Sequence, residues 1–329
     1  MMSLPDFLKK QIVFVFINDG EKMSFKNDNL ILTGSDNKIK LQLTCYRIFV
    51  LFIIGDFSLT SGLVQKSHKF AFPIYLMTGT FKMYDKIGSK MEGNVLLRRK
   101  QYAYSGLELA KFILKNKITN QCILLEQIRT KTDEIKQAIV KLKEIIERIT
   151  YLKGDLYDLL GLEGNAAKIY FKQHFRDLDW KGRKPRIKSD YINAILDIGY
   201  TILFNVIDSL LDVYGFDVYC GVLHKEFYMR KSLTCDLVEP FRVLIDRQVR
   251  KSINLGQFKK EDFIKVNGSY KLDWNQNKKY VLLFSQALME YKTEIFLYIQ
   301  SYYRAFMKQK SAENFDFFVY GEHTNDDTA

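Results

Sequence analysis

The segment spanning residues 223–247 holds the side chains best suited to chemistry: one histidine followed by two carboxylates. It reads LHKEFYMRKSLTCDLVEPFRVLIDR and contains His224, Asp236 and Glu239. On a helix, residues three positions apart occupy neighbouring parts of one face, so Asp236 and Glu239 are expected to lie together. An imidazole combined with carboxylates is a suitable ligand set for a divalent cation such as Mg²⁺ or Mn²⁺.

The same spacing has a structural interpretation. Asp236 followed by Glu239 fits a capping box at a helix N-terminus, with Asp in place of the usual Ser or Thr. Pro240 also fits a first helical turn better than a helix interior. On this segment alone both interpretations stay open, and a metal site needs a partner elsewhere in the chain.

A candidate partner is Glu163, which lies in the segment GLEGNAAKIYF (161–171) between two glycines. We expect it at the start of a helix. The alternative role for Glu163 is a first-turn glutamate that interacts favourably with the helix dipole.

Basic residues predominate over acidic ones, with 50 Lys and Arg against 38 Asp and Glu and a net charge of +12. This charge favours an anionic partner, with nucleic acid ahead of an acidic membrane surface, although a lysine-rich composition alone would give the same excess. Two local clusters are either DNA-facing or simply solvated. They comprise Arg98, Arg99 and Lys100, and the loop residues Lys181, Arg183, Lys184, Arg186 and Lys188.

The elements that must position these residues fall into two parts. Up to about residue 93, short β-branched and aromatic runs alternate with turn signals, which predicts strands at 11–18, 29–33, 38–43, 48–54 and 72–77 and a short helix at 60–69. Beyond that point, helical periodicity predicts helices at 107–114, 123–152, 156–160, 166–175, 191–213, 233–249 and 280–307.

The predicted class is therefore α+β with two domains. Residues 1–85 form a small N-terminal β domain, 86–93 (KIGSKMEG) a hinge, 94–320 a larger all-α catalytic domain, and 321–329 a flexible acidic tail. Four scattered cysteines without metal spacing indicate reduced thiols in a cytoplasmic protein. The longest candidate for a membrane span, 48–54, is too short to cross a bilayer.

Four segments, taken in order, resemble the CRISPR-associated adaptation integrase, the family numbered one among the CRISPR-associated proteins. They are GNVLLRRKQY (93–102), LEGNAAKIYF (162–171), DYINAILDIGYTIL (190–203) and LHKEFYMRKSLTCDLVEPFR (223–242). The sheet-then-helices layout also fits, so the resemblance extends over nearly the whole chain and favours the metal site over the cap.

The resemblance implies that Glu163, His224 and Glu239 bind Mg²⁺ or Mn²⁺, with Asp236 as a further acidic member of the catalytic site. The second acidic position is often aspartate in the family, and the longer Glu239 leaves open whether it or Asp236 binds the metal directly. Met229 stands where the family commonly has glycine. Arg230 and Arg242 join the two basic clusters as candidate DNA contacts.

The implied activity is that of a metal-dependent DNA integrase and endonuclease. A 3′-hydroxyl of a short foreign double-stranded fragment attacks a phosphodiester at the CRISPR repeat and inserts the fragment as a new spacer. The resemblance also implies a homodimer formed through the β domains, and a four-plus-two complex with the small second CRISPR-associated adaptation protein. The alternatives are a general metal-dependent nuclease acting on branched or single-stranded DNA, and a catalytically inert DNA-binding scaffold.

Overall fold

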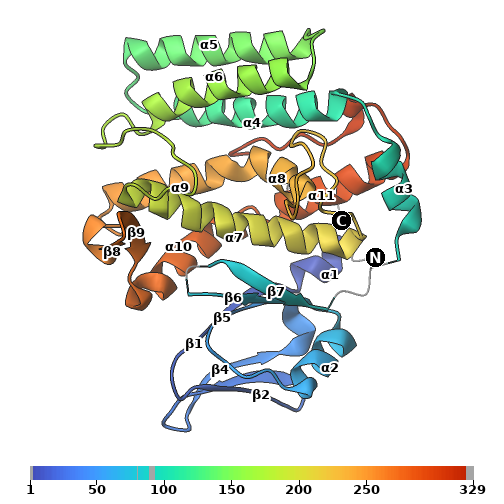
Figure 1. Ribbon diagram of the computed structural model, residues 1–329, viewed down its shortest axis with the longest axis vertical. Coiled ribbons are helices and arrows are strands. Elements are labelled where there is room, and N and C mark those ends of the chain that lie inside the picture. Colours follow the sequence, from blue (N-terminus) through green and yellow to red (C-terminus); the bar gives the residue numbers. More distant parts are fainter. Residues whose placement is uncertain (1–2, 80, 89–92, 324–329) are drawn as a thin grey trace. The chain divides into compact units, whose positions relative to one another are not determined.

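The computed structural model describes residues 3–79, 81–88 and 93–323. The chain divides into two compact units. One comprises residues up to Asn94 together with Asp212–Gly215, and the other comprises Val95–Leu211 and the segment from Phe216 onward. Strands predominate in the first unit and helices in the second, which confirms the predicted class (Figure 1).

The expected boundaries lie partly outside this description. Residues 86 and 87 of the expected hinge belong to the last strand of the first unit, and residues 89–92 lie outside the described residues. Residues 324–329 of the expected tail also lie outside the described residues.

The first unit contains two sheets. A four-stranded sheet has the order β1 (Gln11–Ile17), β5 (Ile48–Gly55), β6 (Ile74–Met77) and β7 (Met83–Ile87). The β1–β5 and β5–β6 pairs are parallel, and β6–β7 is antiparallel. The other sheet is an antiparallel meander of β2 (Lys22–Lys26), β3 (Asn29–Thr33) and β4 (Ile39–Thr44). Two helices complete the unit, α1 (Leu4–Leu8) and α2 (Ser61–Phe70).

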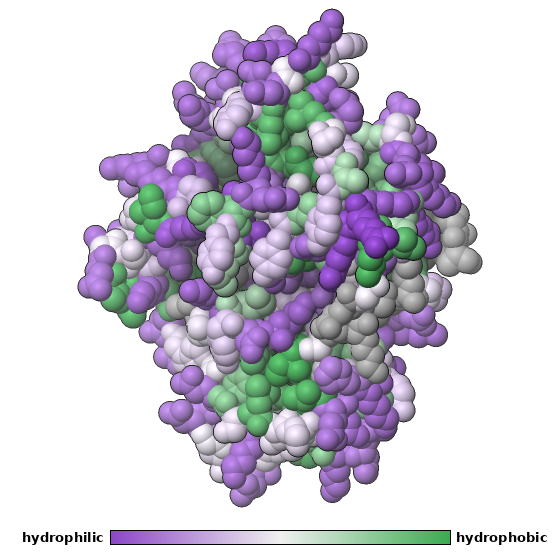
Figure 2. All heavy atoms as spheres, turned by 45° about the vertical axis from the view of Figure 1, so that its right-hand side comes forward, coloured by the Kyte–Doolittle hydropathy of each residue, from purple (hydrophilic) through white to green (hydrophobic). Residues whose placement is uncertain are grey.

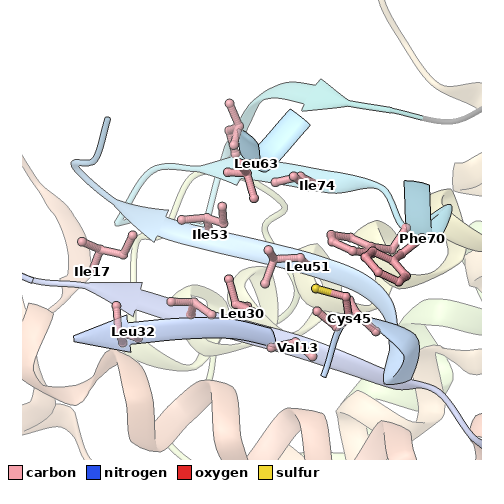
Figure 3. Close-up of a cluster of buried hydrophobic side chains, with 14 residues drawn as sticks. Val13, Ile17, Leu30, Leu32, Cys45, Leu51, Ile53, Leu63, Phe70 and Ile74 are labelled. Carbon is pink, nitrogen blue, oxygen red and sulfur yellow. The ribbon is translucent and has the colours of Figure 1, made fainter. Parts of the chain in front are cut away.

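The two sheets enclose one apolar core (Figure 3). Val13 of β1 and Leu51 of β5 point into it from the parallel sheet, Leu30 of β3 from the meander, and Leu63 and Phe70 from α2. Seven consecutive residues of β5, from 48 to 54, are buried, which is expected for a parallel strand covered on both faces. This burial explains why the run 48–54 is continuously hydrophobic.

The second unit is built from nine helices in the part of the chain that the structure describes, apart from short 3₁₀ turns, and one of these helices ends in residues 212–214 of the first unit. They are α3 (Val95–Ala103), α4 (Glu108–Glu126), α5 (Asp133–Thr150), α6 (Leu156–His174), α7 (Tyr191–Tyr214), α8 (Ser232–Val238), α9 (Arg242–Asn254), α10 (Asn277–Met289) and α11 (Lys292–Met307). The 3₁₀ turn η2 (Glu239–Phe241) joins α8 to α9, and a two-stranded hairpin, β8 (Phe263–Val266) with β9 (Ser269–Leu272), precedes α10.

Several predicted element boundaries were wrong. The single long helix expected at 123–152 is the end of α4 and all of α5, separated by a break at residues 127–132. The two helices expected at 156–160 and 166–175 are one helix, α6, because Gly161 and Gly164 are accommodated in its interior. The strands β2 and β7, the hairpin β8–β9 and helices α1 and α3 were not predicted.

Helix α7 is the most apolar helix of the second unit. By length and composition it could cross a membrane, yet 83% of its most apolar window is buried within the fold. The prediction that 48–54 is the longest candidate for a span was therefore wrong, since α7 is longer.

Figure 2 shows a face of the molecule on which hydrophilic residues predominate.

Helix α4 is clamped to a distant segment by two buried asparagines. Asn116 Nδ2 donates to the carbonyl of Phe318 (2.6 Å), and Asn116 Oδ1 accepts from the Phe318 N–H (3.1 Å). Asn120 Nδ2 donates to the same carbonyl, and its Oδ1 accepts from the Tyr320 N–H (2.7 Å). The clamp fixes the helix that carries Lys117 between these two residues.

Candidate active site

Two of the predicted carboxylates meet on one buried ammonium. Lys117 Nζ of α4 lies 2.5 Å from Glu163 Oε1 of α6 and 2.7 Å from Glu239 Oε2 of η2. The Lys117 and Glu239 side chains are 9% and 4% exposed, and that of Glu163 is 28% exposed. Packing of α4 against both α6 and η2 brings together residues that are 76 positions apart in sequence (163 to 239).

Glu163 lies in the middle of α6, so the prediction that it begins a helix was wrong. The helix starts seven residues earlier, at Leu156, where Asp155 and Asp158 form the capping box. Glu163 therefore gains nothing from the first-turn dipole, which fades beyond the first turn. Its position is set by the contact between α6 and α4.

Asp236 does not cap its own helix, so the capping-box interpretation was also wrong. Asp236 is fully buried in α8, and its carboxylate accepts the N–H groups of Val222 (2.6 Å), Leu223 (3.0 Å) and His224 (2.8 Å). Its Oδ1 also accepts from His224 Nδ1 at 2.7 Å. With Nδ1 donating to this carboxylate oxygen, Nε2 is the ring nitrogen that is available to a metal ion.

Glu239 is held ionised by two cations. Burial alone favours the neutral acid, but Arg242 and Lys117, with a smaller effect from His224, lower the pKa of Glu239 to about 2. Arg242 Nε lies 2.9 Å from Glu239 Oε2. The carboxylate is therefore charged throughout the physiological pH range.

A buried network of two tyrosines and one aspartate holds Arg242 in position. Its guanidinium lies over the ring of Tyr200, 4.6 Å from the centroid, and Tyr200 donates to Asp246 Oδ1. Tyr170 donates to the other oxygen of Asp246 (3.0 Å). Burial raises the pKa of Asp246 to about 6, although these two hydroxyls oppose the shift. The network fixes Arg242, and through it Glu239.

The donor atoms suit a hard divalent cation. Glu163 and Glu239 provide ionisable oxygens, and His224 provides Nε2, with its orientation set by Asp236. Within the described part of the chain, Glu239 Oε2 is buried with charged neighbours but without a partner in hydrogen-bond geometry. Among residues 3–79, 81–88 and 93–323, no three His, Cys, Asp or Glu side chains already form a ligand cluster. Lys117 stands between the two carboxylates instead.

The basic loop is anchored rather than loose. Arg183 donates to Asn193 Oδ1 (3.0 Å) and pairs with Asp197 Oδ1 (2.5 Å), both on α7. The backbone N–H groups of Lys184 and Arg186 are also bound, by Asn193 and Asp197 respectively. The side chains of Lys181, Lys184 and Arg186 are exposed, whereas Arg183 is used to hold the loop.

The other basic candidates lie in different settings. Arg242 forms an ion pair with Glu239. Arg230 precedes α8 and is half-buried beside the Cys235 thiol. Arg99 of α3 is exposed and Arg98 is half-buried.

Lys117 is the residue that the sequence reasoning missed. A signal existed, because Lys117 lies four residues after Ile113 and one before Ile118, within a helix face that is otherwise buried. A lysine on such a face needs a buried partner. The partner carboxylates come from other helices and could not be named from the α4 sequence alone.

The sequence and the fold of this chain are similar to those of known proteins. The model of the family described as "CRISPR associated protein Cas1" matches residues 14–286. A curated relative from Thermodesulfovibrio yellowstonii, "CRISPR-associated endonuclease Cas1 1", is 30% identical over 276 residues, which cover 78% of this chain and 86% of the relative.

Two solved structures share the fold. One is a "Cas6-RT-Cas1--Cas2 complex", with a TM-score of 0.79 and 21% identity, covering 95% of this chain and 36% of that longer chain. The other is a "Casposase bound to integration product", with a TM-score of 0.74 and 21% identity, covering 97% of each chain. The fold is thus shared with proteins whose chains differ widely in length.

Proposed function

Because this chain belongs to the Cas1 family of CRISPR-associated proteins, we propose that it is a metal-dependent integrase that inserts short DNA fragments into a CRISPR array. The observation that carries the proposal is the pair of carboxylates, Glu163 and Glu239, on one buried cation. In the same unit, His224 is oriented by the fully buried Asp236. A scaffold without catalysis would have no use for this arrangement of buried charge, which is costly to assemble.

In the proposed reaction, the oxygen of a fragment's 3′-hydroxyl forms a bond to a phosphorus atom of the CRISPR repeat. The bond from that phosphorus to the adjoining 3′ oxygen of the repeat strand breaks. The attacking hydroxyl loses its proton, and the departing oxygen gains one. No net hydrolysis occurs, so the number of phosphodiester bonds is conserved.

Different residues of this chain would bind the metal, orient a ligand and contact DNA. Glu163, Glu239 and His224 would hold Mg²⁺ or Mn²⁺, which, when bound, neutralises charge developing on the phosphate. Asp236 would keep His224 Nδ1 protonated and the ring in one orientation. Exposed Lys181, Lys184 and Arg186 are candidates for neutralising DNA phosphates away from the reacting bond.

The proposed assembly follows from the family and the neighbours. One neighbour is described as a complex of a Cas1-containing chain with Cas2. We expect this chain to form a homodimer through its β domain and to bind double-stranded DNA together with the small second CRISPR-associated adaptation protein. The stoichiometry expected is four copies of this chain with two of the partner.

A strand-transfer assay tests the activity. It uses the protein with its small partner, a short duplex with 3′-hydroxyl ends, a supercoiled plasmid carrying the repeat, and Mn²⁺. Covalent insertion is expected for the wild type, and insertion lowered at least 100-fold in Glu163→Gln and His224→Ala. Asp133→Asn is the matched control, because the Asp133 carboxylate is 84% exposed on α5.

Other outcomes identify the alternatives. Cleavage without joining, lost in the same two variants, would indicate a nuclease, which the word "endonuclease" in the relative's name also favours. DNA binding without any reaction would indicate the scaffold. Insertion that persists unchanged in Glu163→Gln would refute the assignment of the site.

A further inference from the structure

We propose that Lys117 is an internal, displaceable cation that occupies the position between the two carboxylates until DNA and a divalent ion enter together. The inference rests on the proposed function, because it concerns how the same site is filled. It assigns a positioning and gating role to a lysine on helix α4.

The contacts of Lys117 place its charge where the carboxylates converge. Its ammonium lies 2.5 Å from Glu163 Oε1 and 2.7 Å from Glu239 Oε2, and its side chain is 9% exposed. At these distances the ammonium shields both oxygens from an incoming cation.

The cluster is electrically balanced without a metal. Glu163 and Glu239 bring two negative charges, and Lys117 and Arg242 bring two positive charges. A divalent ion that entered this cluster would meet two cations at close range in a poorly solvated site, where charge repulsion is strong. A DNA phosphate supplies negative charge that would offset the ion, so ion and DNA should bind cooperatively.

Of the two cations, Lys117 is the one free to move aside. Arg242 is packed over the Tyr200 ring, whose hydroxyl is bound to Asp246. Lysine carries a compact charge on a flexible four-carbon stem, whereas the planar guanidinium of arginine is held by stacking. Displacement of Lys117 would release both carboxylates and leave its ammonium available to the DNA phosphate.

The test measures Mn²⁺ binding directly, by calorimetry and by electron paramagnetic resonance. The full-length protein is titrated alone and in the presence of a duplex with 3′-dideoxy ends, which binds without reacting. The wild type is expected to bind Mn²⁺ at least tenfold more tightly with the duplex than without it. Equal affinities would overturn the proposal without reference to any variant.

Variants test the identity of the cation. In the absence of DNA, Lys117→Met is expected to bind Mn²⁺ at least tenfold more tightly than the wild type, and Lys117→Arg no more tightly than the wild type. Lys111→Met is the matched control on the same helix, because the Lys111 ammonium pairs with the exposed Glu108 and not with a proposed metal ligand in the part of the chain that the structure describes. A Lys117→Met protein that is folded by circular dichroism and binds Mn²⁺ equally or more weakly would refute the gating role.

The outcomes separate this inference from the proposed function. If Glu163→Gln abolishes Mn²⁺ binding while Lys117→Met binds like the wild type, only the gating role fails. If the wild type does not bind Mn²⁺ even with DNA, and insertion does not depend on Glu163, the proposed metal site fails as well.

Discussion

Asp236 holds the loop that carries His224 through an unusual concentration of hydrogen bonds. Three consecutive backbone N–H groups and one imidazole nitrogen converge on its buried carboxylate. With its oxygens engaged in this way, Asp236 orients the site, while Glu239 is the acidic residue that faces the shared cation. We therefore propose that Glu239, rather than Asp236, binds the metal directly, which is the choice that the family resemblance leaves open.

Replacement of Asp236 by asparagine should therefore destabilise the fold. The Asn amide group places donors against backbone donors and removes the charge that accepts from them, at a cost of about 3 kcal/mol. Urea unfolding measures the change, and Asp133→Asn on the exposed face of α5 should change stability by less than about 0.5 kcal/mol. Equal effects of the two substitutions would contradict the role of Asp236.

A second residue-scale prediction concerns acid stability. His174 is 3% exposed, its Nε2 lies 3.1 Å from the Asp246 carbonyl, and burial lowers its pKa to about 4. The unfolded chain binds this proton near pH 6.5, so stability from His174 is present above that pH and is lost as the pH falls toward 4. Between pH 7 and pH 5 the loss is about 2 kcal/mol.

The variant His174→Gln isolates this contribution. Its stability relative to the wild type should improve by about 2 kcal/mol when the pH is lowered from 7 to 5. The variant must be compared with the wild type at each pH, because Asp246 also makes stability depend on pH in both proteins. Its pKa is raised to about 6, so its contribution to the free energy of unfolding changes with pH in the opposite direction. A pH-independent difference in the free energy of unfolding would show that His174 does not titrate as inferred.

At the scale of elements, two glycines of similar helical setting have opposite roles. Gly199 of α7 lies where a Cβ would meet Ile245 Cγ2 at 2.5 Å and the Phe284 ring at 2.7 Å, so it permits close packing with α9 and α10. Gly164 of α6 has no atom within 4 Å of an added Cβ, in the part of the chain that the structure describes.

Alanine at these positions should therefore act in opposite directions. Gly199→Ala is expected to destabilise by roughly 1–3 kcal/mol through overpacking, even though alanine is the better helix former. Gly164→Ala is expected to stabilise by about 0.5–1 kcal/mol through the lower backbone entropy of the unfolded chain. Thermal unfolding of the two variants checks both signs, and destabilisation by Gly164→Ala would show that the space beside Glu163 is not open.

Local sequence patterns predicted most of the longer elements but not the residues at which neighbouring elements end and begin. Strands β1, β3 and β5 and helix α7 follow from runs that are buried or strongly periodic. Strand β2 alternates exposed and half-buried residues and gives a weak signal. The break between α4 and α5 was missed because apolar residues recur at helical spacing on both sides of it, and only packing of α5 back on α4 reveals the turn.

At the scale of the whole molecule, the net charge of +12 predicts salt-dependent DNA binding. Lys181→Gln combined with Lys184→Gln should reduce the slope of log affinity against log salt by about 2, because each lost phosphate contact to B-DNA accounts for about 0.9. The free energy of unfolding should stay unchanged, since both side chains are exposed. Arg183→Gln should instead destabilise the loop, because it leaves Asp197 without its ion pair. An unchanged salt slope in the double variant would exclude these lysines as phosphate contacts.

The candidate site was only partly accessible from sequence. Glu163, His224 and Glu239 could be selected by their types and by resemblance, and the structure brings Glu163 and Glu239 onto one ammonium. Other residues, namely Lys117 and the Tyr200–Asp246 network, hold these side chains in position. They depend on contacts between helices that are far apart in sequence. Such contacts have no local pattern that would identify the partners.

The asparagine clamp on α4 has a consequence for the order of folding. Its hydrogen bonds join Asn116 to Phe318, 202 positions apart, and Asn120 to Tyr320, 200 apart. Contacts of such high sequence separation form slowly, because a long loop must close before they can form. Helix α4 can therefore form early while its buried amides are still solvated. We therefore expect the position of Lys117 to become fixed only when the distant segment docks, and the candidate active site to be among the last parts of the molecule to form.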